Sequence, residues 1–250
     1  MDTKKKNMSF IDEEINRYLY WIEERERIRI KKEDSKLEPP WTEDEILKEF
    51  KFCQVFREDD RTTRWFAAHI RRPLSAEPEV IMATIIFRFF NLIETGRTLL
   101  EHNLHLDWNR EKAIEEVSKQ PKWVTGAYIV KTPNRMNKVT GVAECVTDLR
   151  HTYVLDEATD ICSWANAGPG AMRGLNRLTG RPLDFCKRSH DWNGEMQELY
   201  SICKEQLRLE YRMPFEMREV EGGLCEFDKY SRILKGQGRT RSIYDYSKID

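Results

Sequence analysis

Three carboxylates that are able to take part in acid–base chemistry lie close together near the C-terminus, at Glu221, Glu226 and Asp228. The apolar residues between them recur at helical spacing, which predicts a helix that buries one face in a core. We expect Glu221 at the start of this helix, where the positive end of the helix dipole favours an ionised carboxylate. A carboxylate there is suited to activating water or stabilising positive charge, or it simply caps the helix. Because Glu226 and Asp228 lie on other faces, at most some of the three share one pocket.

A second motif, Gly168-Pro169-Gly170, predicts a tight turn, and residues 171–178 predict a helix directly after it. Backbone N–H groups in such a turn, at the N-terminus of a helix, are well placed to bind a phosphate. We therefore expect Gly168, Gly170 and Arg173 to contact a phosphate, with Gly170 at the protein surface.

This turn resembles the hairpin of the helix-hairpin-helix DNA glycosylases, which binds the DNA backbone, so the resemblance implies that Gly168, Gly170 and Arg173 contact DNA. Those enzymes also place a catalytic carboxylate downstream, just inside a helix and after a valine. Val220 and Glu221 are similar to that local pattern, although they lie farther from the turn. Asp191 lies at a distance from the turn that is close to the glycosylase spacing. Asp191 is therefore the competing candidate for the catalytic carboxylate.

A basic segment without any acidic residue follows the carboxylates, and it contains Arg232, Lys235, Arg239 and Arg241. The whole chain has a formal net charge of −1, so these cations form a local patch on a nearly neutral protein. Because the field of a phosphate acts over roughly 10 Å at physiological salt, such a patch suits contact with DNA. The alternatives are a solvated basic loop and, for Arg232, a surface ion-pair network with Asp228 and Lys229.

Composition limits the class of protein. The 250 residues are enough for one large domain or two small ones, and 40% hydrophobic residues are enough for a core. The six cysteines form no C-x-x-C pair and the histidines show no ligand spacing, so we expect free thiols in a reducing cytoplasm, no metal centre and no cofactor. A signal peptide and an apolar run of about 18 residues are both absent, which argues against a membrane protein. We expect a cytoplasmic monomer.

Hydrophobic periodicity predicts an all-α protein, because helical spacing recurs along the chain and strand alternation does not. The predicted helices cover residues 10–32, a short segment from 43, and 61–70, 79–100, 110–118, 142–154, 171–178 and 194–211, while 126–130 is helix or strand. Thr42 and Glu45 form the pattern of a capping box. We expect Trp41, Trp65 and Trp164 in the core. Residues 1–40 are expected to be a flanking charged helix with a linker, and residues 41–250 a domain of the helix-hairpin-helix glycosylase type.

A third motif runs from Phe52 to Trp65, with the pattern Phe-x-x-Val-Phe-Arg-x-x-Asp-Arg-x-Thr-Arg-Trp. Together with the glycine turn and the segment Leu-Cys-Glu-Phe-Asp-Lys-Tyr that ends at Tyr230, it resembles the helical domain of the 5-hydroxymethyldeoxyuridine DNA kinases. That domain is related to the alpha-glutamyl/putrescinyl thymine pyrophosphorylases of bacteriophages and to helix-hairpin-helix DNA glycosylases. The resemblance covers the chain from about Trp41 to about Tyr244, and it implies an all-helical domain that acts on hypermodified pyrimidines in DNA.

The resemblance implies a pocket for the base, and we expect its lining to include Gln54, Arg57, Asp60 and Lys229. Gln54 stands where the family motif has Asn, so one contact of this pocket is expected to differ. A structural ion-pair cluster is the alternative role of Arg57, Asp60 and Arg61. The chain contains no Walker A sequence, so phosphoryl transfer from ATP is not supported.

These observations predict a stand-alone base-handling domain that flips a modified pyrimidine out of double-stranded DNA. The predicted reaction is hydrolysis of the N-glycosidic bond of a 5-hydroxymethyl-derived base, glycosylated or not, in which Glu221 activates water or stabilises an oxocarbenium-like sugar. The product would be an abasic site, and the expected role is defence against phages with modified genomes. Two alternatives stay open: a transferase or pyrophosphorylase of base hypermodification, and a non-catalytic reader of modified DNA.

Overall fold

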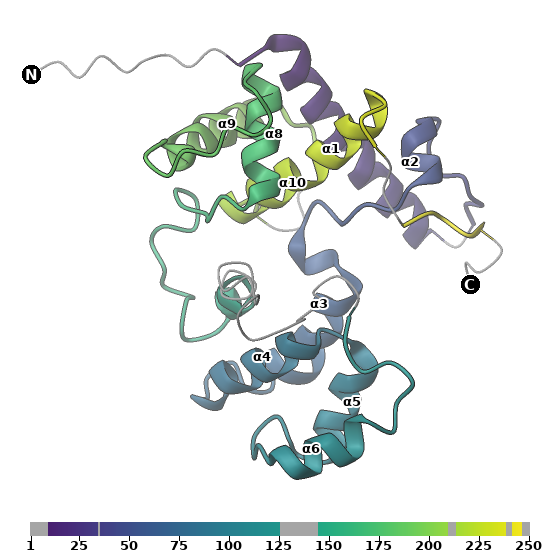
Figure 1. Ribbon diagram of the computed structural model, residues 1–250, viewed down its shortest axis with the longest axis vertical. Helices are drawn as coiled ribbons and strands as arrows, with labels where there is room; N and C mark the ends of the chain where they lie inside the picture. Colours follow the sequence, from purple (N-terminus) through teal and green to yellow (C-terminus); the bar gives the residue numbers. More distant parts are fainter. Residues whose placement is uncertain (1–9, 35, 126–144, 210–213, 239–241, 247–250) are drawn as a thin grey trace, which may run out of the picture. The chain divides into compact units, whose positions relative to one another are not determined.

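The computed structural model describes residues 10–34, 36–125, 145–209, 214–238 and 242–246, and these residues form helices without a strand (Figure 1). The α-helices are α1 (Asp12–Glu33), α2 (Glu45–Glu49), α3 (Arg61–Phe66), α4 (Glu79–Phe90), α5 (Ile93–Glu101), α6 (Arg110–Val117), α8 (Pro169–Thr179), α9 (Trp192–Gln206) and α10 (Met217–Leu234). A π-helical turn at Ala67–Arg71 continues α3, and 3-10 turns lie at Arg57–Asp59 and Leu149–His151. The prediction of an all-α protein is confirmed.

The chain divides into two compact units. The first comprises residues 1–57 and 160–250, and the second comprises residues 58–159. This division does not coincide with the boundary expected near residue 40, because α1 supplies core residues to the first unit: Tyr18, Trp21 and Ile22 are fully buried. Charged residues enter this core in pairs, as Arg29 does with Glu26, which is why a highly charged helix is able to pack inside.

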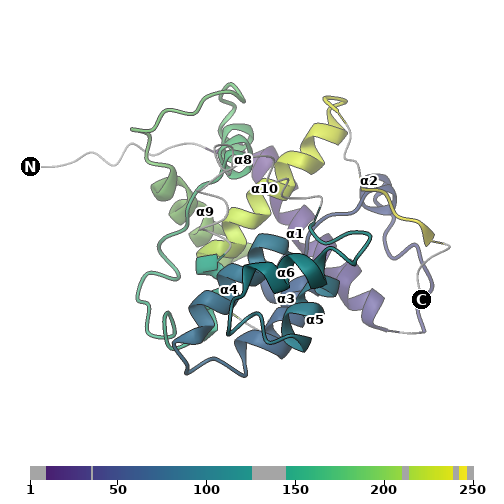
Figure 2. The ribbon, with the colours of Figure 1, turned by 60° about the horizontal axis from the view of Figure 1, so that its bottom comes forward.

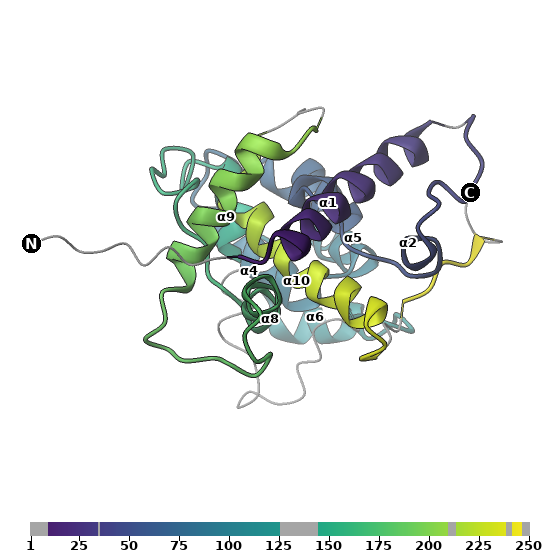
Figure 3. The same ribbon diagram turned by 90° about the horizontal axis from the view of Figure 1, so that it is seen from above.

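Helix α10 is the centre of the first unit, because α1, α2, α8 and α9 all pack against it (Figure 1, Figure 3). Its buried face carries Val220, Leu224 and Phe227, at the spacing that the sequence predicts for a helix. The Phe227 ring meets the Tyr18 ring of α1 edge to face, with the ring centroids 5.4 Å apart. The C-terminal helix therefore connects the N-terminal helix to the helices around the glycine turn.

Helix α8 approaches α10 unusually closely, because two glycines lie on the face of α8 that meets it. A Cβ atom on Gly174 would lie 2.5 Å from the backbone oxygen of Leu224, and one on Gly170 would overlap the Cys225 side chain. Residues four apart lie on one face of a helix, so Gly170 and Gly174 form a continuous flat surface. Side chains that flank this surface are thereby brought within reach of α10.

The second unit contains α3 to α6, which Figure 2 shows gathered together. The rings of Phe66 and Phe87 stack with centroids 5.3 Å apart in its core. Arg88 is buried beside them and binds the fully buried carboxylate of Asp148 through Nε and Nη2. This ion pair ties the segment around Asp148 to helix α4.

The prediction of one long helix over residues 79–100 is wrong, since the helix is interrupted between α4 and α5. Asn91 ends α4 in the left-handed conformation, with φ of 47°, and its side-chain oxygen accepts a hydrogen bond from Arg88. Asparagine tolerates this conformation better than most residues, which explains the stop despite continuous apolar sequence. The break redirects α5, so that Gly96 packs directly on the Trp65 ring.

Other predicted elements differ mainly at their ends. Helix α2 is capped by Asp44 rather than by Thr42, because the Asp44 carboxylate accepts the N–H groups of Ile46 and Leu47, each at 2.9 Å. The described part of the predicted helix 142–154 is one helical turn followed by a 3-10 turn. The segment 126–130 lies outside the described residues.

The close contact between α8 and α10 makes a prediction about stability. Gly174→Ala should lower the free energy of unfolding by about 1–3 kcal/mol, because the added methyl group is forced against the backbone of α10. Chemical denaturation followed by circular dichroism measures this change.

Gly222 supplies the matched control on α10, since a Cβ there would meet nothing within 4 Å. Gly222→Ala should raise the free energy of unfolding by up to about 1 kcal/mol, because alanine favours a helix more than glycine does. Equal stability of the two variants would contradict the close packing of α8 on α10.

Candidate functional site

Helix α10 begins four residues earlier than the predicted position of Glu221. Glu216 is its N-cap, and Glu216 and Glu219 form a capping box in which the Glu216 N–H donates to Glu219 Oε2 at 3.0 Å. Glu221 therefore lies in the second turn of the helix, and the expectation that it starts or caps the helix is wrong. The physical reason is that Glu216 and Glu219 satisfy the first N–H groups of α10, so no cap is required at Glu221.

The carboxylate of Glu221 instead contacts the glycine turn. The Gly168 N–H donates a hydrogen bond to Glu221 Oε1 at 3.2 Å, which joins two motifs that are 53 residues apart in sequence. Gly168 is the N-cap residue of α8, so this carboxylate faces the positive end of the α8 dipole. A carboxylate that is held in this way is suited to stabilising a positive charge that develops next to it.

Gly170 does not lie at the protein surface, contrary to the sequence-based expectation. It is buried, and it packs against Cys225 on the next turn of α10 after Glu221. Desolvation raises the pKa of the Cys225 thiol to about 12, and the Glu226 and Glu221 carboxylates add to the shift. The Cys225 residue nevertheless remains exposed on the surface of α10.

Asp228 holds α10 to α8 through two arginines. Its carboxylate is 3% exposed and accepts hydrogen bonds from Arg173 Nε and Arg177 Nε, each at 2.8 Å. Arg177 also donates to Gln237, beyond the end of α10. The ion pairs run between helices and are largely buried, unlike the surface network with Lys229 and Arg232 that the sequence offered as an alternative. Arg173 is a predicted DNA contact whose side chain remains 42% exposed while it binds Asp228.

Glu226 and Lys229 hold the start of the third sequence motif onto α10. Glu226 Oε2 accepts the Cys53 N–H at 2.9 Å and Lys229 Nζ at 3.0 Å. Lys229 Nζ also donates to the Lys51 carbonyl at 2.9 Å and lies 4.7 Å from the centre of the Phe52 ring. These contacts fix the chain segment that leads to the predicted pocket residues.

The predicted pocket residues do not all belong to one unit. Gln54 and Arg57 are half-buried in the first unit, where the Arg57 backbone N–H donates to Glu219. Asp60 is the residue before α3 and belongs to the second unit. The first unit thus contains Gln54 and Arg57 together with Lys229, whereas Asp60 is described only within the second.

The competing carboxylate Asp191 caps α9. Its Oδ1 accepts the Gly194 N–H at 2.9 Å, and the residue is exposed.

Among the predicted phosphate contacts, Lys235 is exposed and its Nζ lies 2.7 Å from Glu14 Oε1, while the Arg232 side chain packs along Gly238. Arg239 and Arg241 lie outside the described residues.

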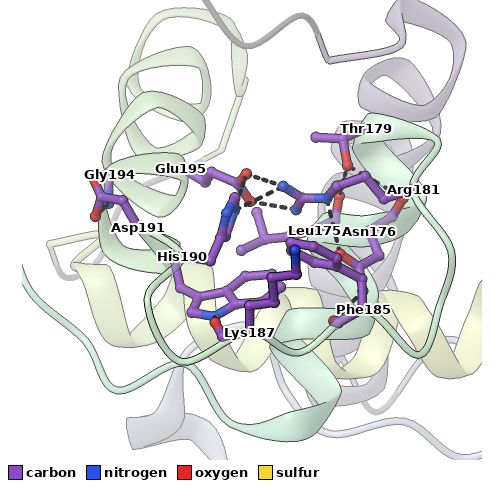
Figure 4. Close-up of polar contacts among 11 residues, drawn as sticks. Leu175, Asn176, Thr179, Arg181, Phe185, Lys187, His190, Asp191, Gly194 and Glu195 are labelled. Carbon is purple, nitrogen blue, oxygen red and sulfur yellow. Dashed lines mark hydrogen bonds and ion pairs between the residues drawn. The ribbon is translucent and has the colours of Figure 1, made fainter. Parts of the chain in front are cut away.

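A cluster that sequence reasoning missed lies between α8 and α9 (Figure 4). Glu195 is fully buried and binds both Arg181 and His190; Arg181 Nη2 lies 2.6 Å from Glu195 Oε2. The Arg181 guanidinium also lies over the rings of Phe185 and Trp192, each 5.2 Å from the ring centroid. The sequence gives only a weak indication of this cluster. Glu195 shares a helical face with the apolar Leu199, but the partners of Glu195 lie in an irregular loop.

No metal-ligand cluster and no membrane helix are present within the described ranges. No group of three or more His, Cys, Asp or Glu residues is arranged to hold a metal ion there. Likewise, none of the helices in these ranges combines the length and the apolar character that crossing a bilayer requires.

The cap of α10 predicts a dependence of stability on pH. Burial raises the pKa of Glu219 to about 7 and Glu216 adds to the shift, whereas Arg218 and the N–H groups of Glu216 and Arg57 lower it. An acid whose pKa is raised on folding stabilises the fold below its unfolded pKa, and this contribution is lost as pH rises through the folded pKa. The free energy of unfolding should therefore fall between about pH 4.5 and pH 7.

Glu219→Gln isolates this effect, because glutamine keeps the capping oxygen but does not ionise. The variant should remove a fall of at most about 3 kcal/mol from the stability curve, as measured by denaturation from pH 4.5 to pH 8. Parallel curves for the wild type and the variant would show that Glu219 does not titrate in this range.

Of three comparisons with known proteins, the one with protein families gives a match. A family model described as "5-hmdU DNA kinase, helical domain" matches residues 12–147 and 143–239, which include the third motif, the glycine turn and α10. Curated proteins and solved structures give no match. Since the family model covers most of the chain, the protein belongs to the family of the 5-hmdU DNA kinase helical domain.

Proposed function

We propose that this protein is a DNA glycosylase that excises a 5-hydroxymethyl-derived pyrimidine from double-stranded DNA. The observation that carries the proposal is the Glu221 carboxylate, which is held by the Gly168 N–H at the start of α8. The description of the family names 5-hmdU in DNA, which supports DNA with this class of base as the substrate.

The reaction breaks the bond between C1′ of the sugar and N1 of the base. As the base departs, positive charge develops on the sugar, and the ionised Glu221 carboxylate stabilises that charge. Glu221 accepts a proton from water as the water oxygen bonds to C1′. The base leaves with the electrons of the broken bond, and solvent protonates it at N1. The products are the free base and an abasic sugar.

The surroundings of Glu221 favour a charged, fixed carboxylate. The Gly168 N–H orients Oε1, and the dipole of α8 favours the ionised form. Glu221 lies one helical turn before Cys225, on the side of α10 that faces the start of α8. A base has to leave the DNA stack to reach any such group, which costs a few kcal/mol and is cheapest for a weakly paired base.

The biological role that follows is defence against phages whose DNA carries the modified base, because excision would leave unmodified DNA intact. A second candidate is a transferase or pyrophosphorylase that acts on the same bases during hypermodification. The family description favours this candidate, since it names a kinase of a modified nucleotide in DNA. Both candidates require binding of DNA and access to an extruded base.

Glu221→Gln tests the excision chemistry. Glutamine retains an oxygen that accepts the Gly168 N–H, so affinity for DNA should change little, whereas excision should fall by roughly 100-fold or more. The assay uses a duplex with a single 5-hydroxymethyluracil, measures abasic sites by alkaline cleavage and identifies the released base by mass spectrometry.

Asp191→Asn is the matched control, because it also removes a carboxylate but one that caps α9. This variant should lose about 1 kcal/mol of stability or less and keep its excision rate. Loss of excision in Asp191→Asn with an active Glu221→Gln would move the chemistry to Asp191. An altered nucleoside formed only with an added amine or an activated base would indicate a transferase, and tight binding without product would indicate a reader.

The basic segment is tested through the salt dependence of binding. If Arg239 and Arg241 contact phosphates, replacing either with alanine should reduce the slope of log K against log salt by about 0.9, for modified and unmodified duplexes alike. Lys119→Ala is the control, because Lys119 is an exposed cation of the second unit that pairs with Glu116. An unchanged slope in both arginine variants would exclude this segment from the DNA interface.

A further inference from the structure

Trp164 is the exposed aromatic residue closest in sequence to the contact between Gly168 and Glu221. The expectation that Trp41, Trp65 and Trp164 lie in the core is confirmed for the first two, which are 6% and 9% exposed. Trp164 is 53% exposed, so the expectation is wrong for this residue. An indole that is half open to water presents a broad apolar ring face.

The loop that carries Trp164 is held firmly by α9. The Ser163 carbonyl accepts hydrogen bonds from Asn193 Nδ2 at 2.9 Å and from Gln197 Nε2 at 2.6 Å. Asn193 Oδ1 in turn accepts the Ala165 N–H at 3.2 Å. The residues on both sides of Trp164 are therefore fixed by side chains of one helix, although Trp164 itself is exposed.

The same loop is held by α10 at both ends. The Met217 N–H, in the first turn of α10, donates to the Ile161 carbonyl at 3.1 Å. At the other end, the Gly168 N–H donates to Glu221 one turn further along α10. The position of the Trp164 backbone is thus tied to the position of the proposed catalytic carboxylate.

The chemistry of this loop suits a base and not a phosphate. Residues 161–168 contain no charged side chain, so they supply no cation to a DNA backbone. An aromatic face stacks on any nucleobase, and because the loop is already ordered, little conformational entropy is lost on binding.

We infer that Trp164 is the stacking platform for the nucleobase that is extruded from DNA at the Glu221 site. The inference rests on the proposed function and deepens it by naming the residue that receives the flipped base. Asn193 and Gln197 are positioning residues, which act by holding the loop on α9.

The experiment measures binding of Trp164→Ala, Trp164→Phe and wild-type protein to a duplex with one 5-hydroxymethyluracil, by fluorescence anisotropy. Trp164→Ala should weaken binding by roughly 5- to 150-fold, which corresponds to the loss of one base–aromatic stack. Trp164→Phe should recover most of this loss, because phenylalanine keeps an aromatic face. Trp108→Ala, which removes an exposed indole in the second unit, should leave affinity unchanged.

A second duplex, with a tetrahydrofuran abasic analogue at the target position, separates stacking from other effects. The penalty of Trp164→Ala should nearly vanish on this DNA, because no base is present to stack. A penalty of the same size on both duplexes, or no penalty on either, would overturn the inference while leaving the proposed DNA binding in place. Failure of the wild-type protein to bind either duplex would overturn the proposed function and, with it, the inference.

Discussion

The close approach of α8 to α10 is the constraint on which the first unit depends. Gly170 and Gly174 permit it, because a side chain at either position would collide with α10. At this separation the N–H of Gly168 reaches Glu221, and two arginines of α8 reach Asp228. If the helices lay farther apart, the carboxylate of Asp228 would be buried without its partners, which costs several kcal/mol.

Three buried carboxylates of the described residues are bound in the same way. Asp228, Glu195 and Asp148 are almost or fully buried, and each is bound by one or more arginines. In the interior, the attraction between two charges offsets the cost of removing them from water only when their geometry is good. Further contacts hold these arginines in that geometry. For Arg181 those contacts include Asn176 Oδ1 at 3.0 Å and two aromatic rings (Figure 4). The resulting clusters fix the loops between helices as well as the helices themselves.

The glycine turn makes contacts within the protein that its sequence does not predict. Its first N–H binds a carboxylate of the same protein, and its second glycine is buried by Cys225, so these two groups serve internal packing. The turn nevertheless keeps a connection to the proposed chemistry, because it orients Glu221. The carboxylates that the sequence placed together also divide by role: Asp228 joins helices, Glu226 holds the segment at Cys53, and Glu221 faces the turn.

The sequence by itself determined the helical class, the buried face of α10 and the family, because periodicity and motif residues are local features. It predicted α6 and most of α8 and α9 for the same reason. Only the tertiary structure decided that α10 starts at Met217 with Glu216 as its cap, that the chain turns at Asn91 and that Gly170 is buried. These outcomes depend on capping partners, on a left-handed residue and on helix contacts, whose energies are comparable to those of the local alternatives. The tertiary structure also decided the exposure of Trp164, since an indole is found both in cores and at surfaces, and the anchoring of its loop determines which.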